Sequence, residues 1–274
     1  MKKRLLHATA IPAILLAMCA FALAARNLPA QDWAKQKLDK SPRHQQWVTF
    51  KNGDRTVQAF IVYPEVSHKA PVIVMIHEIF AMTDWVQSMA DDLAAQGYIV
   101  IAPDLLSGTG PNGGGSSAYP DQSARVKAVS MLSNDQVMGD LNAAADYALK
   151  LPAANGKLAV IGFCWGGGKS FLFATQRHDL SAAYVFYGTP PKDLAAISAP
   201  VYGFYAGNDA RISATVPQTR KDMKAAGKKY EAVIYPGAGH GFMRAGEDPS
   251  NTNPANTTAR NDAMKRLVKL LKKI

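Results

Sequence analysis

The sequence predicts an α/β fold in which a mostly parallel central sheet of about eight strands carries helices on both faces. Two observations predict it. Short apolar runs alternate with amphipathic segments along most of the chain, which is typical of strand–helix–strand units. Several runs, such as residues 71–77, are apolar at nearly every position, as strands covered on both faces are. With 274 residues the chain can bury one sizeable core.

Residues 1–24 have the three features of a secretory signal peptide. Residues 2–4 are all basic, residues 10–24 form an apolar run, and residues 22–24 read Ala-Leu-Ala, which fits a cleavage site. The apolar run is too short to favour a stable membrane span. We therefore expect a secreted or periplasmic protein without a span after cleavage. Lipid attachment at Cys19 and a retained signal anchor are the alternatives.

The charge balance bears on the partners of the protein. The formal net charge is +10. Cleavage would remove three cations and no acid, which leaves about +7. An excess of Lys and Arg can attract anionic substrates or surfaces. No basic stretch is interleaved with aromatic residues, so we expect no nucleic-acid partner. We also expect the protein to be a monomer.

The chain after the signal opens with a polar extension and a hairpin. Residues 25–45 are mostly polar and are expected to form an N-terminal extension with room for one short helix. Residues 46–274 are expected to form the folded domain. Residues 47–50 and 57–63 flank Asn-Gly-Asp at 52–54, which is a strong turn signal and predicts a β-hairpin.

From residue 71 onwards, strands and helices alternate. Strands are expected at 71–77, 98–102, 157–162, 182–188, 200–206 and 230–235, and helices at 84–97, 125–132, 135–151, 164–177, 213–226 and 255–274. The Ser- and Gly-rich residues 107–117 predict a flexible stretch, either a rim or lid of a site or a surface insertion. In such a fold, function is expected at the carboxyl ends of the strands.

The segment Gly-Phe-Cys-Trp-Gly at 162–166 lies where a predicted strand passes into a helix. It fits G-x-C-x-G, the nucleophile elbow of α/β-hydrolases with Cys in place of Ser. The glycines permit a tight turn and close backbone packing. Cys164 would then lie at a helix N-terminus, where free N–H groups favour a thiolate. After signal cleavage it would be the only cysteine, which excludes an intramolecular disulfide. A buried structural cysteine is the alternative.

Three strand ends carry reactive groups in the order Cys164, Asp209, His240. Nucleophile, acid and histidine follow in this order in α/β-hydrolases. His240 can accept the thiol proton, and Asp209 can hold the imidazole in the required tautomer. The adjacent pair at 77–78, His-Glu, would point its side chains apart on a strand, so we expect neither a metal site nor a cofactor.

From about Trp47 to its end, the chain resembles the dienelactone hydrolase family of α/β-hydrolases. The motifs that carry the resemblance are His77-Glu78-Ile79-Phe80, Ala102-Pro103-Asp104-Leu105, Gly162-Phe163-Cys164-Trp165-Gly166-Gly167, Asp209 and His240-Gly241-Phe242. The resemblance implies that Cys164, Asp209 and His240 form the catalytic triad.

The resemblance also implies roles for neighbours of the triad. The backbone N–H groups of Trp165 and Ile79 would form the oxyanion hole. Glu78 would interact with the resting thiol and help to govern its ionisation. A carboxylate near a thiol disfavours the thiolate by like-charge repulsion unless it moves or a cation compensates it. A helix-start carboxylate is the plainer interpretation of Glu78.

In this family, two arginines hold the carboxylate of dienelactone. Arg244 matches one of them. The other would follow residues 104–105, where this chain has Leu-Ser-Gly at 106–108, so that arginine is missing. Arg211 and Arg125 are candidates to replace it. Loss of the paired clamp argues against dienelactone itself as substrate but leaves ester or lactone hydrolysis intact.

Together these features predict a carboxymethylenebutenolidase-like hydrolase. It would cleave a small carboxylic ester or lactone, an anionic one included, through a Cys-His-Asp triad and an acyl-enzyme. Two functions of other classes stay open: a non-catalytic envelope protein that binds ligands on the same fold, and a thiol-based redox protein.

Overall fold

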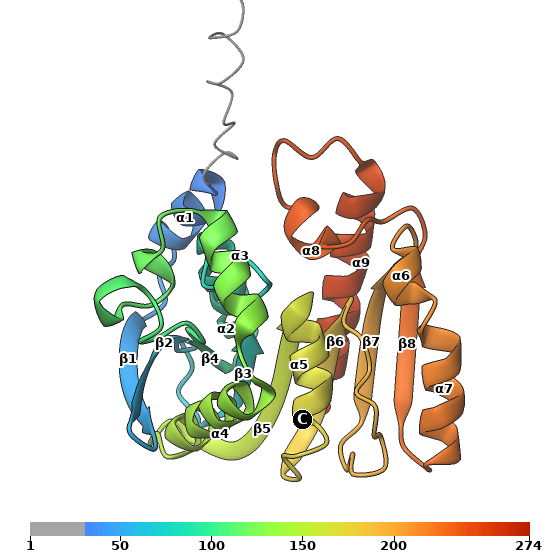
Figure 1. The fold of residues 1–274 in the computed structure, drawn as a ribbon, viewed down its shortest axis with the longest axis horizontal. Coiled ribbons are helices and arrows are strands. Elements are labelled where there is room, and N and C mark those ends of the chain that lie inside the picture. Colours follow the sequence, from blue (N-terminus) through green and yellow to red (C-terminus); the bar gives the residue numbers. More distant parts are fainter. Residues whose placement is uncertain (1–30) are drawn as a thin grey trace, which may run out of the picture.

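Eight strands form one sheet in the computed structural model of the chain, which describes residues 31–274 (Figure 1). In spatial order they are β1 (Gln45–Asn52), β2 (Arg55–Val62), β4 (Ile99–Pro103), β3 (Ala70–Ile76), β5 (Ala154–Phe163), β6 (Leu180–Phe186), β7 (Val201–Ala206) and β8 (Tyr230–Tyr235). The β1–β2 and β2–β4 pairs are antiparallel, and the other five pairs are parallel. The predicted mostly parallel sheet of about eight strands is confirmed.

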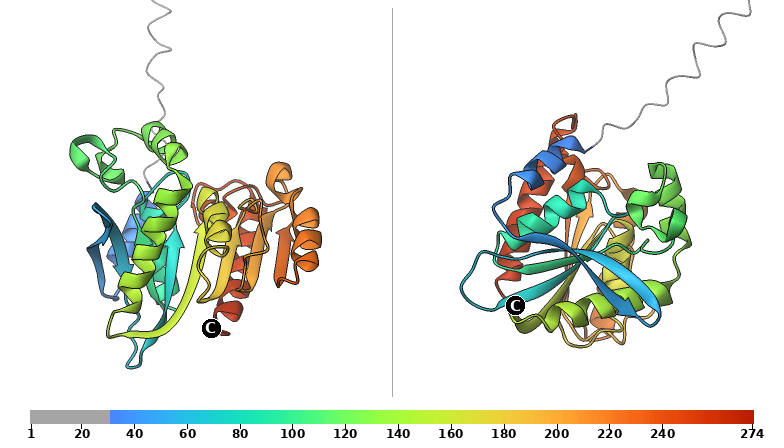
Figure 2. Two further views of the ribbon diagram at one scale, coloured as in Figure 1. Left: turned by 60° about the horizontal axis from the view of Figure 1, so that its bottom comes forward. Right: turned by 90° about the vertical axis from the view of Figure 1, so that its left-hand side faces the viewer.

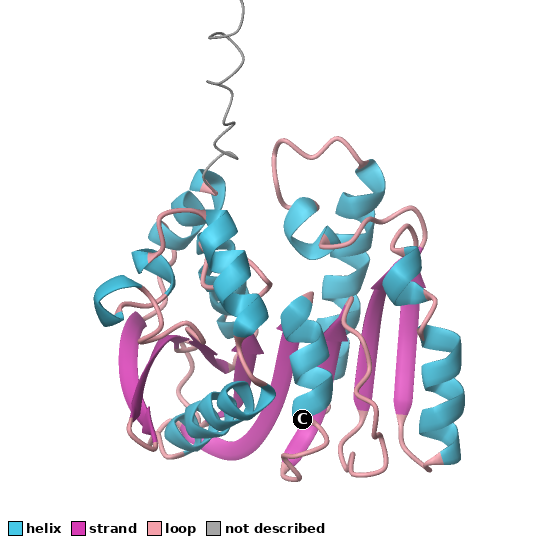
Figure 3. Cartoon of the chain, viewed as in Figure 1, coloured by secondary structure: helices cyan, strands magenta, loops and turns pink. Residues whose placement is uncertain are grey.

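Helices cover both faces of this sheet (Figures 2 and 3). The helices are α1 (Asp32–Asp39), α2 (Asp84–Ala94), α3 (Gln122–Met131), α4 (Asn134–Leu149), α5 (Trp165–Phe173), α6 (Ala210–Ser213), α7 (Val216–Ala225), α8 (Phe242–Ala245) and α9 (Pro254–Leu271). Side chains from α2 and α9 pack on one face, and those from α4, α5 and α7 on the other. Successive strand residues point to opposite faces. Ile73 and Met75 therefore contact the first layer, while Val72 and Val74 contact the second.

The helix predicted at 213–226 is confirmed as α7, but it begins at Val216 rather than at Ser213. The chain forms α6 and then α7, with Pro217 in the first turn of α7. Proline has no N–H to donate inside a helix, and its ring clashes with the preceding turn. A continuous helix through residues 210–225 would meet both penalties, so the chain breaks after Ser213 and restarts. The break leaves Asp209 as the N-cap of α6, where it accepts a hydrogen bond from the N–H of Ile212.

Residues 107–117 were expected to be flexible, and the structure instead gives them two short 3₁₀ turns and a buried anchor. The turns are η1 (Pro111–Gly113) and η2 (Ser116–Ala118). The Ser116 N–H and hydroxyl donate to the buried carboxylate of Asp104, over 2.7 and 2.5 Å. These bonds attach the segment to the end of β4 and fix its path.

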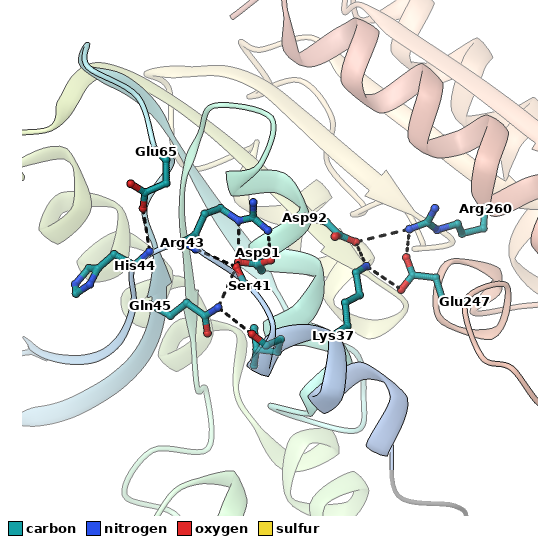
Figure 4. A network of polar contacts seen from close by, with 11 residues as sticks. Lys37, Ser41, Arg43, His44, Gln45, Glu65, Asp91, Asp92, Glu247 and Arg260 are labelled. Carbon is teal, nitrogen blue, oxygen red and sulfur yellow. Dashed lines mark hydrogen bonds and ion pairs between the residues drawn. The ribbon is translucent and has the colours of Figure 1, made fainter.

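A polar network attaches α1 and the segment after it to the rest of the fold (Figure 4). The carboxylate of Asp91 on α2 is 3% exposed and accepts hydrogen bonds from Arg43 and Ser41. Lys37 on α1 lies 2.5 Å from Asp92 and 3.9 Å from Glu247. The N-terminal helix is thereby joined both to α2 and to the segment that follows α8.

The predicted signal peptide at 1–24, with Cys19 and the first residues of the extension, lies outside the described residues. Within residues 31–274, no helix combines the length and apolarity needed to cross a membrane.

The Asp91 network predicts a large effect of one substitution on stability. Arg43→Met should lower the free energy of unfolding by about 2 kcal/mol, because Asp91 would stay buried with only neutral hydrogen-bond partners. Denaturant unfolding followed by circular dichroism measures the change. The control is Lys35→Met, whose partner Asp39 is 58% exposed; a shift within about 0.5 kcal/mol is expected there. Equal effects of the two substitutions would contradict the assignment.

Candidate active site

The turn between β5 and α5 holds Cys164 in a conformation that L-residues rarely adopt. Its φ is +58° and its ψ is −118°. Strain of this kind persists only where the surroundings impose it. A Cβ on Gly162 would lie 2.0 Å from the carbonyl oxygen of Gly166, and one on Gly166 would lie 2.3 Å from that of His77. The glycines of the motif are therefore required by the packing of the turn.

The three residues predicted as a triad come together at the carboxyl ends of the strands. Nε2 of His240 lies 3.0 Å from Sγ of Cys164, and Nδ1 lies 2.5 Å from Oδ2 of Asp209. Cys164 follows β5, Asp209 follows β7, and His240 lies on the loop after β8. Asp209 is 9% exposed, whereas the His240 side chain is 34% exposed. The imidazole thus bridges a buried carboxylate and a thiol that faces a pocket.

Burial alone would lower the pKa of His240. The hydrogen bonds and charges of Cys164 and Asp209 outweigh burial and raise the pKa to about 9. A histidine with this pKa is protonated at neutral pH, so Nε2 directs one N–H at the sulfur and Nδ1 directs the other at the carboxylate. This arrangement favours proton transfer between the two partners of a nucleophilic pair.

Trp165 and Ile79, predicted to supply the oxyanion hole, both line the pocket that contains Cys164. Neither backbone N–H has an acceptor in the part of the chain that the structure describes. Trp165 is the first residue of α5, where N–H groups have no intrahelical partner. Its ring stacks on His77 at 5.6 Å between centroids. Two free donors next to the thiol fit the requirement for stabilising an oxyanion.

Glu78 contacts Arg244 and not the thiol. The Arg244 Nε donates to Oε2 of Glu78 over 2.8 Å, and the Glu78 carboxylate is 3% exposed. Burial raises the pKa of Glu78, while the charges of Arg244 and His240 oppose the rise. Arg244, expected to bind substrate, is therefore engaged inside the protein, and its guanidinium also lies over the Phe80 ring. Within residues 31–274, His240 is therefore the only side chain that forms a hydrogen bond with the thiol of Cys164.

The pocket above the thiol has a volume of about 920 Å³. It is lined by Ile79, Asn134, Cys164, Trp165, Gly168, Lys169, Leu172, Thr175, Tyr187, Thr189, Pro190, Pro191, Lys192, Asp193, Arg211, Ile212 and His240. Arg211, one of the two candidates to replace the missing arginine, belongs to this lining, whereas Arg125 and Arg244 do not. None of residues 107–117 lines it, which favours the surface insertion over the rim or lid for that segment.

Sequence reasoning missed Tyr187 and Lys169, which also line this pocket. Tyr187 follows β6 with φ +40°, is fully buried, and places its ring 5.0 Å from that of His240. The sequence contains no signal for this position, because the predicted strand at 182–188 runs past Tyr187, whereas β6 ends at Phe186. Lys169 lies within the helix after the elbow, where spacing alone does not tell which way a side chain points.

Within residues 31–274, no three His, Cys, Asp or Glu side chains gather where they could hold a metal ion. His77 donates from Nδ1 to the carbonyl oxygen of Glu78 over 2.7 Å, and burial lowers the pKa of its ring. The ring is therefore neutral and acts as a support for Trp165.

The contacts of His240 predict its titration. NMR of labelled histidine should give a pKa of about 9 for His240, and Cys164→Ala should lower it, because one of the two raising partners is lost. The folded-state value exceeds the unfolded value of about 6.5. The protonated ring therefore stabilises the fold below about pH 6.5, and this contribution is lost as pH rises towards 9. A pKa that stays at 9 in Cys164→Ala would assign the whole effect to Asp209.

Comparison with known proteins places this site in a family. The dienelactone hydrolase family model matches residues 57–274. A Salmonella typhi protein named "Putative carboxymethylenebutenolidase" is 34% identical over 200 residues, or 67% of this chain and 72% of that protein. The "Carboxymethylenebutenolidase" of Pseudomonas putida is 30% identical over 182 residues, or 64% and 76% of the two chains.

Among solved structures, the "Putative Dienelactone Hydrolase" of Klebsiella pneumoniae is 27% identical with a TM-score of 0.73. The match covers 85% of this chain and 99% of that chain. The residues that the family model matches include the turn between β5 and α5 and all three hydrogen-bonded residues, Cys164, His240 and Asp209. The predicted resemblance is confirmed: the chain belongs to the dienelactone hydrolase family of α/β-hydrolases.

Proposed function

We propose that this hydrolase cleaves a small carboxylic ester or lactone through an acyl-enzyme on Cys164. The observation that carries the proposal is the continuous chain Cys164–His240–Asp209 at the elbow, with contacts of 3.0 and 2.5 Å. The name of the Pseudomonas putida relative, a carboxymethylenebutenolidase, supports a lactone or ester as the substrate class.

In the first half-reaction, Nε2 of His240 holds the thiol proton while Sγ of Cys164 attacks the carbonyl carbon. The new C–S bond places a negative charge on the carbonyl oxygen, which the N–H groups of Trp165 and Ile79 stabilise. The C–O bond to the alcohol then breaks, and His240 passes its proton to the leaving oxygen. A thioester on Cys164 and the free alcohol result; a lactone keeps both parts in one molecule.

In the second half-reaction, water takes the place of the alcohol. His240 accepts a proton from the water, whose oxygen attacks the thioester carbon. The tetrahedral intermediate collapses, the C–S bond breaks and the carboxylic acid leaves. The thiolate of Cys164 and the protonated His240 then form the starting pair again. Asp209 accepts the Nδ1–H hydrogen bond throughout, which keeps Nε2 directed at the reacting atoms.

In this mechanism the ion pair between Glu78 and Arg244 keeps the negative charge of Glu78 from opposing ionisation of the Cys164 thiol. A free carboxylate near the thiol would disfavour its ionisation. The guanidinium of Arg244, 2.8 Å from Glu78, compensates that charge. Glu78 would influence the thiol only if Arg244 moved away from it.

The acyl-enzyme predicts a mass adduct. Brief mixing of wild-type protein with a panel of activated esters and lactones should add the acyl mass to Cys164, detected by intact-protein mass spectrometry. Cys164→Ala should show no adduct and a kcat/KM at least about 1,000-fold lower, because no nucleophile remains. Asp209→Asn should keep the adduct but form it about 100-fold or more slowly. Turnover by Cys164→Ala at the wild-type rate would exclude the mechanism.

We also propose that the protein is exported, on the basis of the signal features in residues 1–24. Expression of the full chain should yield a mature protein whose intact mass lacks residues 1–24. A product that begins at Cys19 and carries lipid mass would favour the lipid-anchored alternative. Recovery of the uncleaved chain in the cytoplasm would contradict export.

A further inference from the structure

Besides His240, which is paired with Asp209, the pocket above Cys164 is lined by three cations, Lys169, Lys192 and Arg211. The one acid in its lining, Asp193, caps its own turn by accepting the N–H of Ala195 over 2.9 Å. No ion pair within residues 31–274 includes any of the three cations. The pocket therefore carries positive charge that the protein itself leaves without an anionic partner.

Lys169 is the most enclosed of these cations. It lies on α5, four residues after Trp165, and its Nζ is 4.9 Å from the centre of the Trp165 ring. The same Nζ donates to Oδ1 of Asn134 over 2.6 Å. Two contacts from different elements thus hold the ammonium group, and one of them is the residue proposed to stabilise the oxyanion. Lys192 and Arg211 are exposed at the mouth of the pocket.

The placement of Lys169 has an electrostatic cost. Burial lowers the pKa of its ammonium group. A partly desolvated charge without a counter-ion is unfavourable, and an anion that enters the same cavity offsets the loss. Arg244 is already neutralised by Glu78. The cations free to bind a ligand anion therefore lie on the α5 and α6 side of the thiol.

We propose that Lys169 binds a carboxylate carried by the substrate, with Arg211 and Lys192 attracting it to the pocket. The inference rests on the proposed hydrolysis and assigns recognition of a substrate carboxylate to Lys169, on the α5 side of the thiol, in place of the paired arginines. Lys169 would set specificity without taking part in bond making or breaking.

The kinetic test compares two esters that differ in charge. Mono-4-nitrophenyl glutarate carries a carboxylate on its acyl part, and 4-nitrophenyl butyrate is neutral. Lys169→Met keeps the length of the side chain and removes the charge. It should lower kcat/KM about tenfold for the glutarate ester and less than twofold for the butyrate ester. 4-Acetoxybenzoate, compared with phenyl acetate, places the carboxylate on the leaving group and identifies which part of the substrate meets Lys169.

The matched control is Lys221→Met. Lys221 is an exposed lysine on α7 outside the pocket, so its loss changes the net charge equally. It should leave both rates within twofold of wild type. Equal losses for charged and neutral esters in Lys169→Met, or no loss for either carboxylate-bearing ester, would overturn the proposal while leaving hydrolysis through Cys164 intact.

A binding measurement separates this inference from the proposed reaction. Glutarate should change the fluorescence of Trp165, which contacts Lys169, and Lys169→Met should weaken glutarate binding about tenfold. The neutral diamide of glutarate should bind neither protein. Unchanged glutarate binding by Lys169→Met would overturn the inference. Lysine-dependent binding by a protein that cleaves no ester would instead reject the hydrolysis and keep the anion site.

Discussion

Close backbone packing around the elbow is the constraint on which the rest of the site depends. A Cβ on Gly167 would lie 2.3 Å from the carbonyl oxygen of Phe186, and one on Gly188 would lie 2.2 Å from the carbonyl carbon of Gly167. With the contacts of Gly162 and Gly166, these approaches press the start of α5 against the ends of β3 and β6. The positive φ of Cys164 follows, because the chain has no other path between β5 and α5.

The same packing determines what surrounds the thiol. The end of β3 supplies the Ile79 N–H, and the start of α5 supplies the Trp165 N–H. The end of β6 supplies Tyr187, whose ring edge meets His240. A change that loosened the turn would therefore displace Cys164, the two free N–H groups and the ring beside His240 together. The glycines affect the site because they allow neighbouring backbone segments to approach closely. Since other residues would clash there, the glycines can be recognised as a motif in the sequence.

The features predicted from the sequence were those encoded by local pattern. Apolar runs identified the strands, and the elbow with its chain order identified Cys164, Asp209 and His240. The break at Pro217 was readable in principle, since proline excludes a continuous helix there. The pairing of Glu78 with Arg244 was not, because it joins residues 166 positions apart and depends on where the tertiary fold places α8.

The anchoring of residues 107–117 was missed for a similar reason. A Ser- and Gly-rich composition reports low intrinsic order, whereas the buried carboxylate of Asp104 supplies tertiary bonds to Ser116 that composition does not contain. The direction of Lys169 likewise depends on Asn134, which another helix provides. Side chains held by distant partners are the part of a site that local sequence does not encode.

The distribution of charge around Cys164 determines the side from which an anion can approach the thiol. One arginine expected from the family is absent at residues 106–108, and the other, Arg244, is committed to Glu78. An anion entering from that side would have to break a buried ion pair, which costs several kcal/mol. An anion that approaches Lys169 breaks no such pair, and it meets an ammonium group already partly stripped of water. Electrostatics therefore favours the approach of an anion from the α5 side of the elbow.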